Sequence, residues 1–156
     1  MKMYPGSSDA QIVDALRKKG YKATSQRIAI CRFALRSRDH PSAQSVYREI
    51  KPVHPTVSLA TIYKTLHVLN ELGLVGELAF PDGETRYDSY MPPHANLVCR
   101  RCGDIRDIDD PVTREMVARV AAKARFTLIG QRLDIYGICQ KCNHRTRNAS
   151  RRHQKE

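Results

Sequence analysis

Two Cys-x-x-Cys pairs constrain this chain more than any other feature of its sequence. The pairs are Cys99-Arg-Arg-Cys102 and Cys139-Gln-Lys-Cys142, and 36 residues lie between them. Four thiolates arranged as two such pairs are typical of a tetrahedral zinc site. We therefore predict a structural zinc ion that ties the two ends of the intervening segment together.

Other uses of paired cysteines fit this sequence less well. A redox-active dithiol needs one pair at a helix N-terminus of a βαβ unit, whereas here both pairs occupy strand-like positions. Disulfides need an oxidising compartment, and no signal-peptide pattern indicates one. A catalytic zinc needs an open coordination position, which four thiolates do not leave, and no nucleophile and base lie near the cysteines. We therefore expect no enzyme.

The segment between the pairs is too long for a zinc finger, whose inner gap is about 12–20 residues. Its pattern predicts a strand over Ile105–Ile108, a helix over Pro111–Ala124 and a second strand within Thr127–Ile138. Gly103 and Asn143, which follow the two pairs, tolerate positive φ, and that conformation turns backbone N–H groups toward the sulfurs. The sequence thus predicts a β-α-β unit closed by metal.

Charge suggests the partner of the chain. The 156 residues include 27 Lys and Arg against 16 Asp and Glu, a net charge of +11, which favours a polyanion such as nucleic acid. Residues 143–156 are the most basic segment and almost lack apolar side chains, so we expect a disordered tail that either attracts phosphates or only aids solubility. No apolar run approaches the roughly 20 residues of a membrane span, and we expect a soluble, cytoplasmic protein.

The N-terminal half predicts four helices. The first runs from Asp9 to Lys19 before Gly20, and the second begins after the N-cap Thr24. The apolar side of the second helix is predicted to comprise Ile28, Cys31, Ala34 and Leu35, with Cys31 as a small core residue. The third helix extends from Pro41-Ser42 to Ile50, and the fourth from Ser58 to Gly73, with an apolar seam of Leu59, Ile62, Leu66, Leu69 and Leu72.

The outer side of the fourth helix has an unusual composition. Near its N-terminus it carries Ala60, Thr61, Tyr63, Lys64 and His67, which are small, hydroxylated, aromatic or basic. A plain solvent-exposed helix would hold more Glu, although an ordinary amphipathic helix remains the alternative. Methyl and aromatic groups can contact thymine methyls and Lys can reach guanine or phosphate, so this face suits a DNA major groove.

A hairpin is predicted to follow the fourth helix. Its strands fall within Leu74–Phe80 and Thr85–Tyr87, and Pro81-Asp82-Gly83 forms the turn. Helices followed by such a hairpin make a winged helix, in which Arg86 would touch backbone phosphates. We therefore predict an α+β protein with a winged-helix DNA-binding domain at 1–88, a small zinc-stapled α/β domain at 89–142 and the tail at 143–156.

Six motifs taken together resemble the ferric uptake regulator family, from about residue 10 to residue 142. They are Thr24-Ser-Gln-Arg27, Asp39-His-Pro-Ser42, Ser58-x-Ala-Thr-Ile-Tyr63, Gly83-x-x-Arg86-Tyr-Asp88, His94-x-x-x-x-Cys99-x-x-Cys102-Gly103 and Leu133-x-Ile-Tyr-Gly137-x-Cys139-x-x-Cys142. The resemblance implies a metal-dependent transcription regulator, usually a repressor, that forms homodimers through its C-terminal domain. Its winged helices would bind double-stranded DNA at AT-rich inverted repeats. Asp88 and Asp107 make the chain similar to the peroxide-responsive branch of that family.

The resemblance also implies a second metal site, which senses Fe(II) or Mn(II) between the two domains. In the peroxide-responsive branch this regulatory site has three histidines and two aspartates, and the corresponding residues here are His40, Asp88, His94, Asn96 and Asp107. The four cysteines match the structural zinc ligands, and Tyr63 matches a recognition-helix tyrosine. A further metal site found in parts of the family looks absent, because its positions hold Pro93, Ala95 and Gln131. The remaining histidines, His54, His67, His144 and His153, are not at ligand positions.

Asn96 is the main departure from the family pattern, because it replaces a histidine. An amide oxygen is a hard, weak ligand, so the change should lower affinity for Fe(II), Zn(II) and Ni(II) more than for Mn(II). Three interpretations stay open: a five-ligand site with the Asn96 oxygen bound, a four-ligand site with water, or a site that no longer senses metal and leaves a constitutive repressor. If Fe(II) binds, peroxide could oxidise His40 or His94 and release DNA; loss of metal alone would do the same reversibly.

Overall fold

The computed structural model describes residues 8–79 and 84–143, which form two compact units divided between Met91 and Pro92. The predicted turn Pro81-Asp82-Gly83 and most of the predicted disordered tail, residues 144–156, lie outside the described residues. Among the described residues, no helix has the length and apolar character that crossing a membrane requires.

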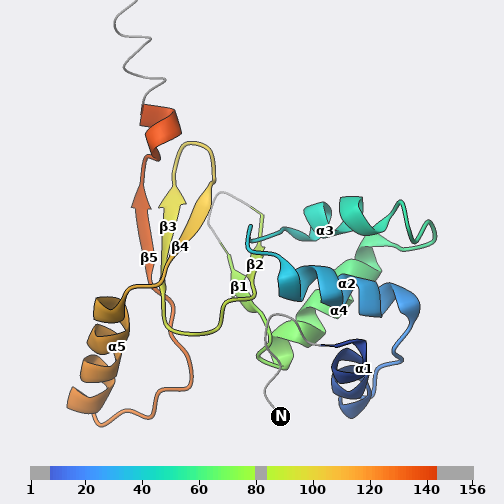
Figure 1. Cartoon of the computed structure of the whole chain (residues 1–156), viewed down its shortest axis with the longest axis horizontal. Coiled ribbons are helices and arrows are strands. Elements are labelled where there is room, and N and C mark those ends of the chain that lie inside the picture. Colours follow the sequence, from blue (N-terminus) through green and yellow to red (C-terminus); the bar gives the residue numbers. More distant parts are fainter. Residues whose placement is uncertain (1–7, 80–83, 144–156) are drawn as a thin grey trace, which may run out of the picture. The chain divides into compact units, whose positions relative to one another are not determined.

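Four helices build the first unit, as the sequence predicted (Figure 1). They are α1 (Asp9–Lys18), α2 (Ser25–Arg36), α3 (Ala43–Ile50) and α4 (Leu59–Glu71). In each case a hydroxyl at the N-cap accepts a hydrogen bond from a backbone N–H in the first turn, which satisfies a donor that the helix itself leaves open. These caps are Ser8, Thr24, Ser42 and Ser58. Gly20 and Gly73 adopt positive φ just beyond α1 and α4, as helix-ending glycines do.

The core of the first unit lies where α2 packs against the other three helices. Ile30, Cys31, Ala34 and Leu35 of α2 are buried, together with Ile12, Leu16, Val46, Ile62, Leu66 and Leu69 from the other helices. The predicted position of Ile28 was wrong in part: Ile28 is only half-buried, and Ile30 occupies the core instead. Ile28 still packs against this core as a partly buried side chain.

A two-stranded wing completes the first unit. Strands β1 (Gly76–Leu78) and β2 (Arg86–Asp88) pair antiparallel, with Leu78 opposite Arg86. β1 is shorter than the predicted strand, and β2 begins and ends one residue later than predicted. On its other edge β2 forms a bridge between Arg86 and Ser42, the residue that caps α3. The wing is therefore fastened directly to the segment that leads into α3.

The second unit is a three-stranded sheet with one helix. Its elements are β3 (Ala95–Cys99), β4 (Ile105–Ile108), α5 (Pro111–Lys123) and β5 (Asp134–Gly137), and the strand order is β4-β3-β5. β3 pairs antiparallel with β4 and parallel with β5 (Figure 1). The predicted strand at Ile105–Ile108 and the helix from Pro111 are confirmed.

The predicted β-α-β order is present as β4-α5-β5, but its two strands are not neighbours in the sheet. Because β3 lies between them, β4 and β5 do not pair, and they run in opposite directions. The sequence reading did not identify β3, and only 134–137 of the expected second strand is extended in the sheet. Asn143 was expected at positive φ but instead continues a helical turn at 140–143, whereas Gly103 does adopt φ +72°.

Helix α5 has no buried residue, although half of its side chains are apolar or small. Val112 is 71% exposed and Val120 61% exposed, and after the helix Phe126 and Ile129 are 76% and 100% exposed. Apolar side chains scattered singly over a surface are ordinary, but a continuous group on one helix and its following segment is typical of an interaction surface.

Candidate metal centres and nucleic-acid interface

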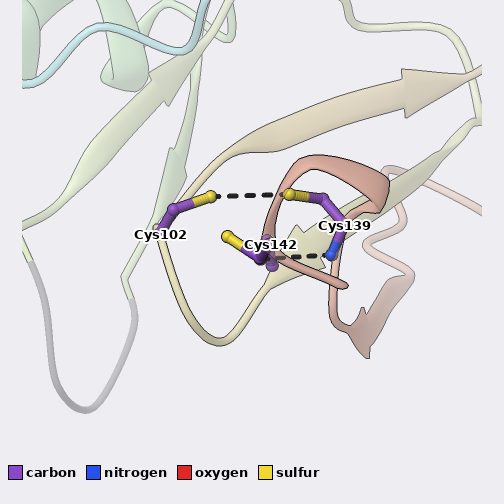
Figure 2. Close-up of side chains that lie close together, drawn as sticks. Cys102, Cys139 and Cys142 are labelled. Carbon is purple, nitrogen blue, oxygen red and sulfur yellow. Dashed lines mark hydrogen bonds between the residues drawn. The ribbon is translucent and has the colours of Figure 1, made fainter. Parts of the chain in front are cut away.

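The structure brings the four predicted zinc cysteines together. Cys99 is the last residue of β3. Cys102 lies in the turn before β4, and Cys139 and Cys142 follow β5 (Figure 2). All four sulfurs lie within 4.8 Å of one another, and the sulfurs of Cys102 and Cys139 are 3.7 Å apart. A tetrahedral zinc with Zn–S bonds of about 2.3 Å requires sulfur pairs about 3.8 Å apart. The cluster therefore fits a zinc ion.

The protonation chemistry of the cluster also fits a cation. The backbone N–H of Cys139 donates to the Cys99 sulfur at 3.3 Å and, with that of Cys102, lowers the pKa of Cys99 to about 6. Burial and the neighbouring sulfurs raise the pKa of Cys142 to about 12. Four thiols this close cannot all ionise without a positive charge among them, and Zn²⁺ supplies that charge.

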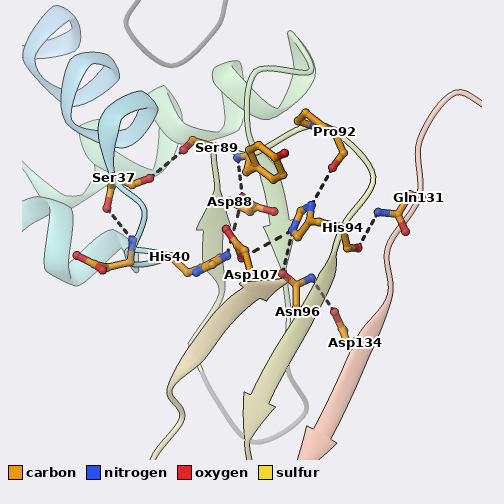
Figure 3. Close-up of polar contacts among 12 residues, drawn as sticks. Ser37, His40, Asp88, Ser89, Pro92, His94, Asn96, Asp107, Gln131 and Asp134 are labelled. Atoms are coloured by element: carbon orange, nitrogen blue, oxygen red, sulfur yellow. Dashed lines mark hydrogen bonds and ion pairs between the residues drawn. The ribbon is translucent and has the colours of Figure 1, made fainter. Parts of the chain in front are cut away.

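A second group of potential ligands lies in the same unit, at the start of β3. The Nε2 atom of His94 is 3.1 Å from Oδ1 of Asn96 and 3.8 Å from Oδ1 of Asp107 (Figure 3). Asn96 and Asp107 are directly opposite each other in the β3–β4 pairing, and His94 precedes Asn96 by two residues, so these side chains share one face of the sheet. We name His94, Asn96 and Asp107 the C-terminal half-site.

The hydrogen bonds of His94 determine what its ring offers to this half-site. Its Nδ1 lies 2.8 Å from the backbone carbonyl oxygen of Pro92, which can only accept, so Nδ1 carries the proton. In the neutral ring Nε2 then presents a lone pair, and it faces an amide oxygen and a carboxylate oxygen. All three atoms are acceptors, so none of them can donate a hydrogen bond to another. A metal cation could bind all three at once.

Asn96 and His94 also form hydrogen bonds with residues outside the C-terminal half-site. The Nδ2 of Asn96 donates to Oδ1 of Asp134 at 3.0 Å, and the side chain of Gln131 donates to the backbone oxygen of His94 at 2.9 Å. From the sequence, Gln131 only replaced a ligand of the family's further metal site. In the structure its side chain supports the backbone of His94. Asp134 was missed by sequence reasoning, because only the register of β3 with β5 reveals that it lies beside Asn96.

The first unit contains another pair of potential ligands, His40 and Asp88, which we name the N-terminal half-site. The bridge between Ser42 and Arg86 places His40 opposite Asp88 two residues further along, and His40 Nε2 lies 3.9 Å from Asp88 Oδ1. The same oxygen accepts the backbone N–H of Tyr90 at 2.7 Å, which orients the carboxylate. Both side chains are buried.

His40 adopts a backbone conformation that is rare for a residue other than glycine. Its φ is +47°, and it directly precedes a proline. Such conformations cost on the order of 1–3 kcal/mol and concentrate at functional sites. The only other described non-glycine residue at positive φ is Arg125, at the end of α5. The strain at His40 is consistent with a side chain placed for ligation.

The predicted nucleic-acid face of α4 is open to solvent. Ala60, Tyr63, Lys64 and His67 are exposed, and Thr61 is half-buried. The Tyr63 hydroxyl donates to Oε1 of Gln44 on α3 at 3.3 Å, and His67 lies 3.5 Å from Glu71. Arg86 is half-buried in the wing, between β1 and Ser42. The buried seam of α4, by contrast, faces the core, so the helix has the two sides that a recognition helix needs.

The pattern of a winged helix followed by a cysteine-closed sheet is that of a known group of regulators. The model of the ferric uptake regulator family matches residues 18–136. The chain belongs to this family. Over 130 residues this family member is 35% identical to the peroxide-responsive repressor PerR of Staphylococcus epidermidis, and the match spans 83% of this chain and 87% of that protein.

Solved structures of regulators share the fold of this chain. The peroxide stress regulator of Campylobacter jejuni matches with a TM-score of 0.69 and 34% identity, over 84% of this chain and 98% of that one. The ferric uptake regulator Fur of Helicobacter pylori matches with a TM-score of 0.75 and 22% identity, over 92% and 97% of the two chains, which bears on the fold alone. The predicted α+β fold, with its N-terminal winged helix and small C-terminal domain, is confirmed.

Proposed function

We propose that this protein is a homodimeric, metal-dependent transcriptional repressor that responds to peroxide, and not an enzyme. The observation that carries the proposal is the convergence of the His94 Nε2 lone pair with oxygens of Asn96 and Asp107 on one face of the sheet. Similarity to a peroxide-responsive repressor over most of the chain supports the same function. The protein would act in the cytoplasm on double-stranded DNA.

The two metal centres have different roles in this proposal. Cys99, Cys102, Cys139 and Cys142 hold a permanent structural zinc, and the thiolates leave it no open position for chemistry. The regulatory ion, Fe(II) or Mn(II), is bound by the two half-sites together: His40 and Asp88 from the winged helix, and His94, Asn96 and Asp107 from the second unit. The resemblance to the family supports this sharing of one ion.

Because the proposed ligands come from two units, metal binding would restrict the angle between these units. Without metal, the angle between the units that fits two successive DNA half-sites is only fractionally populated, which lowers the apparent DNA affinity by that fraction. Ligation by both half-sites selects this angle. When bound, ferrous iron supplies the electrons that reduce peroxide beside its ligands. His40 and His94 are the proposed oxidation targets, and modification of either one would remove an imidazole ligand.

We propose that DNA is recognised by α4 and the wing. Ala60, Thr61, Tyr63, Lys64 and His67 would enter the major groove of an AT-rich inverted repeat, and Arg86 would contact phosphate. The exposed apolar side chains of α5 support a second copy of the chain as the dimer partner, since water contact with Val112, Val120 and Phe126 is unfavourable. A dimer also matches the two-fold symmetry of an inverted repeat.

The test is DNA binding by the zinc-loaded protein to an AT-rich inverted repeat, titrated with Mn(II) and, without oxygen, with Fe(II). We expect DNA affinity to rise at least about tenfold with either metal, a coupling of about 1.4 kcal/mol. A peroxide pulse should release DNA from the Fe(II) form only, with one oxygen added to a peptide that contains His40 or His94. Tight binding that ignores both metals would instead identify a constitutive repressor.

Two histidine variants sharpen this test. His40→Asn removes the imidazole but keeps a residue that tolerates positive φ, so the backbone conformation is preserved. It should abolish the metal response without changing zinc content. His54→Asn in the same unit, at a position outside both half-sites, should leave the metal response intact.

A further inference from the structure

We propose that Asp134 is a positioning residue that turns the oxygen, and not the nitrogen, of the Asn96 side chain toward the regulatory metal. The inference rests on the proposed function, because it explains how an asparagine can serve as a ligand where the family uses histidine. It concerns only residues of the second unit. Asp134 itself would not touch the metal.

The register of the sheet places Asn96 between two acids. In the central strand β3, Asn96 is opposite Asp107 of β4 on one side and opposite Asp134 of β5 on the other. The three side chains therefore form a row across one face of the sheet. Asp107 lies at the half-site, near His94, whereas Asp134 lies at the other end of the row.

Without Asp134, the amide of Asn96 would favour the wrong orientation. Its NH₂ group can donate two hydrogen bonds, and the half-site presents two acceptors, the His94 Nε2 lone pair and the Asp107 carboxylate. An NH₂ group that donated to these atoms would close the half-site, and an amide nitrogen with two hydrogens is not a metal ligand. The half-site alone thus draws Asn96 into a conformation that excludes metal.

Asp134 opposes this preference because a carboxylate only accepts. Its Oδ1 accepts from Asn96 Nδ2 at 3.0 Å, so an amide turned around would bring two oxygens into contact. Its other oxygen, Oδ2, accepts from Arg132 at 2.6 and 2.8 Å and from the Tyr136 hydroxyl at 3.3 Å. These contacts fix the carboxylate and direct Oδ1 at Asn96.

The hydrogen bonds of Asp134 support this role. Its carboxylate accepts from three donors: the guanidinium of Arg132, the side-chain amide of Asn96 and the hydroxyl of Tyr136. Arg132 and the Asn96 amide nitrogen both donate to Asp134, which accepts from both. With its nitrogen bound in this way, the Asn96 side chain turns its oxygen toward His94 Nε2.

The test compares two Asp→Asn variants of the full-length, zinc-loaded protein. Asp134→Asn leaves a neutral amide that can donate or accept, so Asn96 is free to turn. Asp104→Asn is the matched control, since Asp104 also accepts from an arginine two residues away, Arg106, at 3.1 Å but does not contact Asn96. Mn(II) binding is measured by electron paramagnetic resonance of the free ion. We expect about a tenfold loss of Mn(II) affinity for Asp134→Asn and none for Asp104→Asn.

Two further measurements separate positioning from a general structural role. In the protein without regulatory metal, the Asn96 side-chain NH₂ should give slowly exchanging nuclear magnetic resonance signals, and Asp134→Asn should remove this protection without lowering the thermal unfolding midpoint relative to Asp104→Asn. The double variant Asn96→Asp/Asp134→Asn exchanges amide and carboxylate and again directs an oxygen at the half-site. It should recover at least the original Mn(II) affinity.

The outcomes distinguish this inference from the proposed function. Mn(II) binding that is equal in the unaltered protein and in Asp134→Asn would overturn the positioning role but leave the regulatory site in place. An absence of Mn(II) binding in the unaltered protein would overturn the regulatory site, and the inference with it. Loss of zinc or of the folded state in Asp134→Asn alone would show that Asp134 is structural.

Discussion

At the scale of single residues, Asn96 would decide which ions the proposed regulatory site prefers. A histidine would bring a third imidazole, which suits Fe(II) and Zn(II), whereas the amide oxygen of Asn96 is harder and binds more weakly. The structure directs this oxygen toward His94. This chain therefore differs by one ligand atom from the set that its family pattern implies: an amide oxygen replaces an imidazole nitrogen.

Substituting Asn96 tests this preference directly. Asn96→His should raise affinity for Fe(II) and Zn(II) by about tenfold or more and Mn(II) affinity by less, because imidazole is the softer ligand. Competition titrations with a chromophoric chelator would measure the ratio. Asn96→Ala is the control: it should lower Mn(II) affinity about tenfold if the oxygen is a ligand. Unchanged affinity in Asn96→Ala would favour the four-ligand site with water.

The fifth cysteine provides a second prediction at this scale. Burial raises the pKa of Cys31 to about 12, despite an opposing influence of Arg27, so the thiol is protonated and unreactive at neutral pH. At pH 8, iodoacetamide should modify none of the cysteines of the zinc-loaded protein, and only Cys99, Cys102, Cys139 and Cys142 after chelation. Mass spectrometry counts the adducts. Modification of Cys31 before unfolding would contradict its place in the core.

At the scale of elements, α4 combines a face in the core with an exposed face that we propose recognises DNA. Ile62, Leu66 and Leu69 are buried, while Tyr63, Lys64 and His67 are exposed. Anchoring by the buried face holds the exposed residues in fixed positions relative to the wing. The contact between Tyr63 and Gln44 adds a link to α3, and it restricts the tyrosine before DNA arrives.

A lysine substitution tests the recognition role of α4. Lys64→Ala should weaken binding to the inverted repeat by about tenfold, because a base or phosphate contact is worth about 1–3 kcal/mol. Fluorescence anisotropy at several salt concentrations separates the two kinds of contact: loss of a phosphate contact lowers the salt slope by about 0.9, whereas loss of a base contact reduces discrimination between sequences.

Lys123→Ala serves as the control for this substitution. It also removes one exposed cation, but from the end of α5 in the other unit. The DNA affinity of this variant should change little. An equal loss in both variants would mean that Lys64 contributes only net charge.

At the scale of the whole molecule, the exposed surface of α5 points to a dimer. Burying a valine side chain stabilises an interface by roughly 1.5–3 kcal/mol, so several such residues are needed for a stable pair. Val112, Met116 and Val120 lie four residues apart and therefore on one side of the helix. None of the three is buried against the described part of the chain.

Val120→Glu should convert the dimer to monomers, because a charge in an apolar interface is costly to desolvate. Sedimentation at several concentrations would detect the change, and affinity for the inverted repeat should fall in parallel. Val53→Glu is the matched control, since Val53 is 75% exposed but belongs to the first unit. Dimers that persist in Val120→Glu would exclude α5 from the interface.

The sequence by itself determined the local features of this protein. Helix caps such as Ser58, the buried seam of α4 and the two cysteine pairs depend on spacing within about twenty residues, and periodicity and ligand spacing report such spacing directly. The cysteine pairs were also sufficient to predict that distant segments meet, because four ligands to one ion must converge.

Only the tertiary structure decided how strands pair across the sheet. β3 lies between β4 and β5, and this order makes Asn96 a neighbour of both Asp107 and Asp134. The sequence of a strand does not specify which strand it pairs with. It also leaves the register open, because a shift of the pairing by one residue turns every side chain to the opposite face of the sheet. For the same reason Asp134 could not be identified beforehand, although it sets the orientation of the Asn96 side chain.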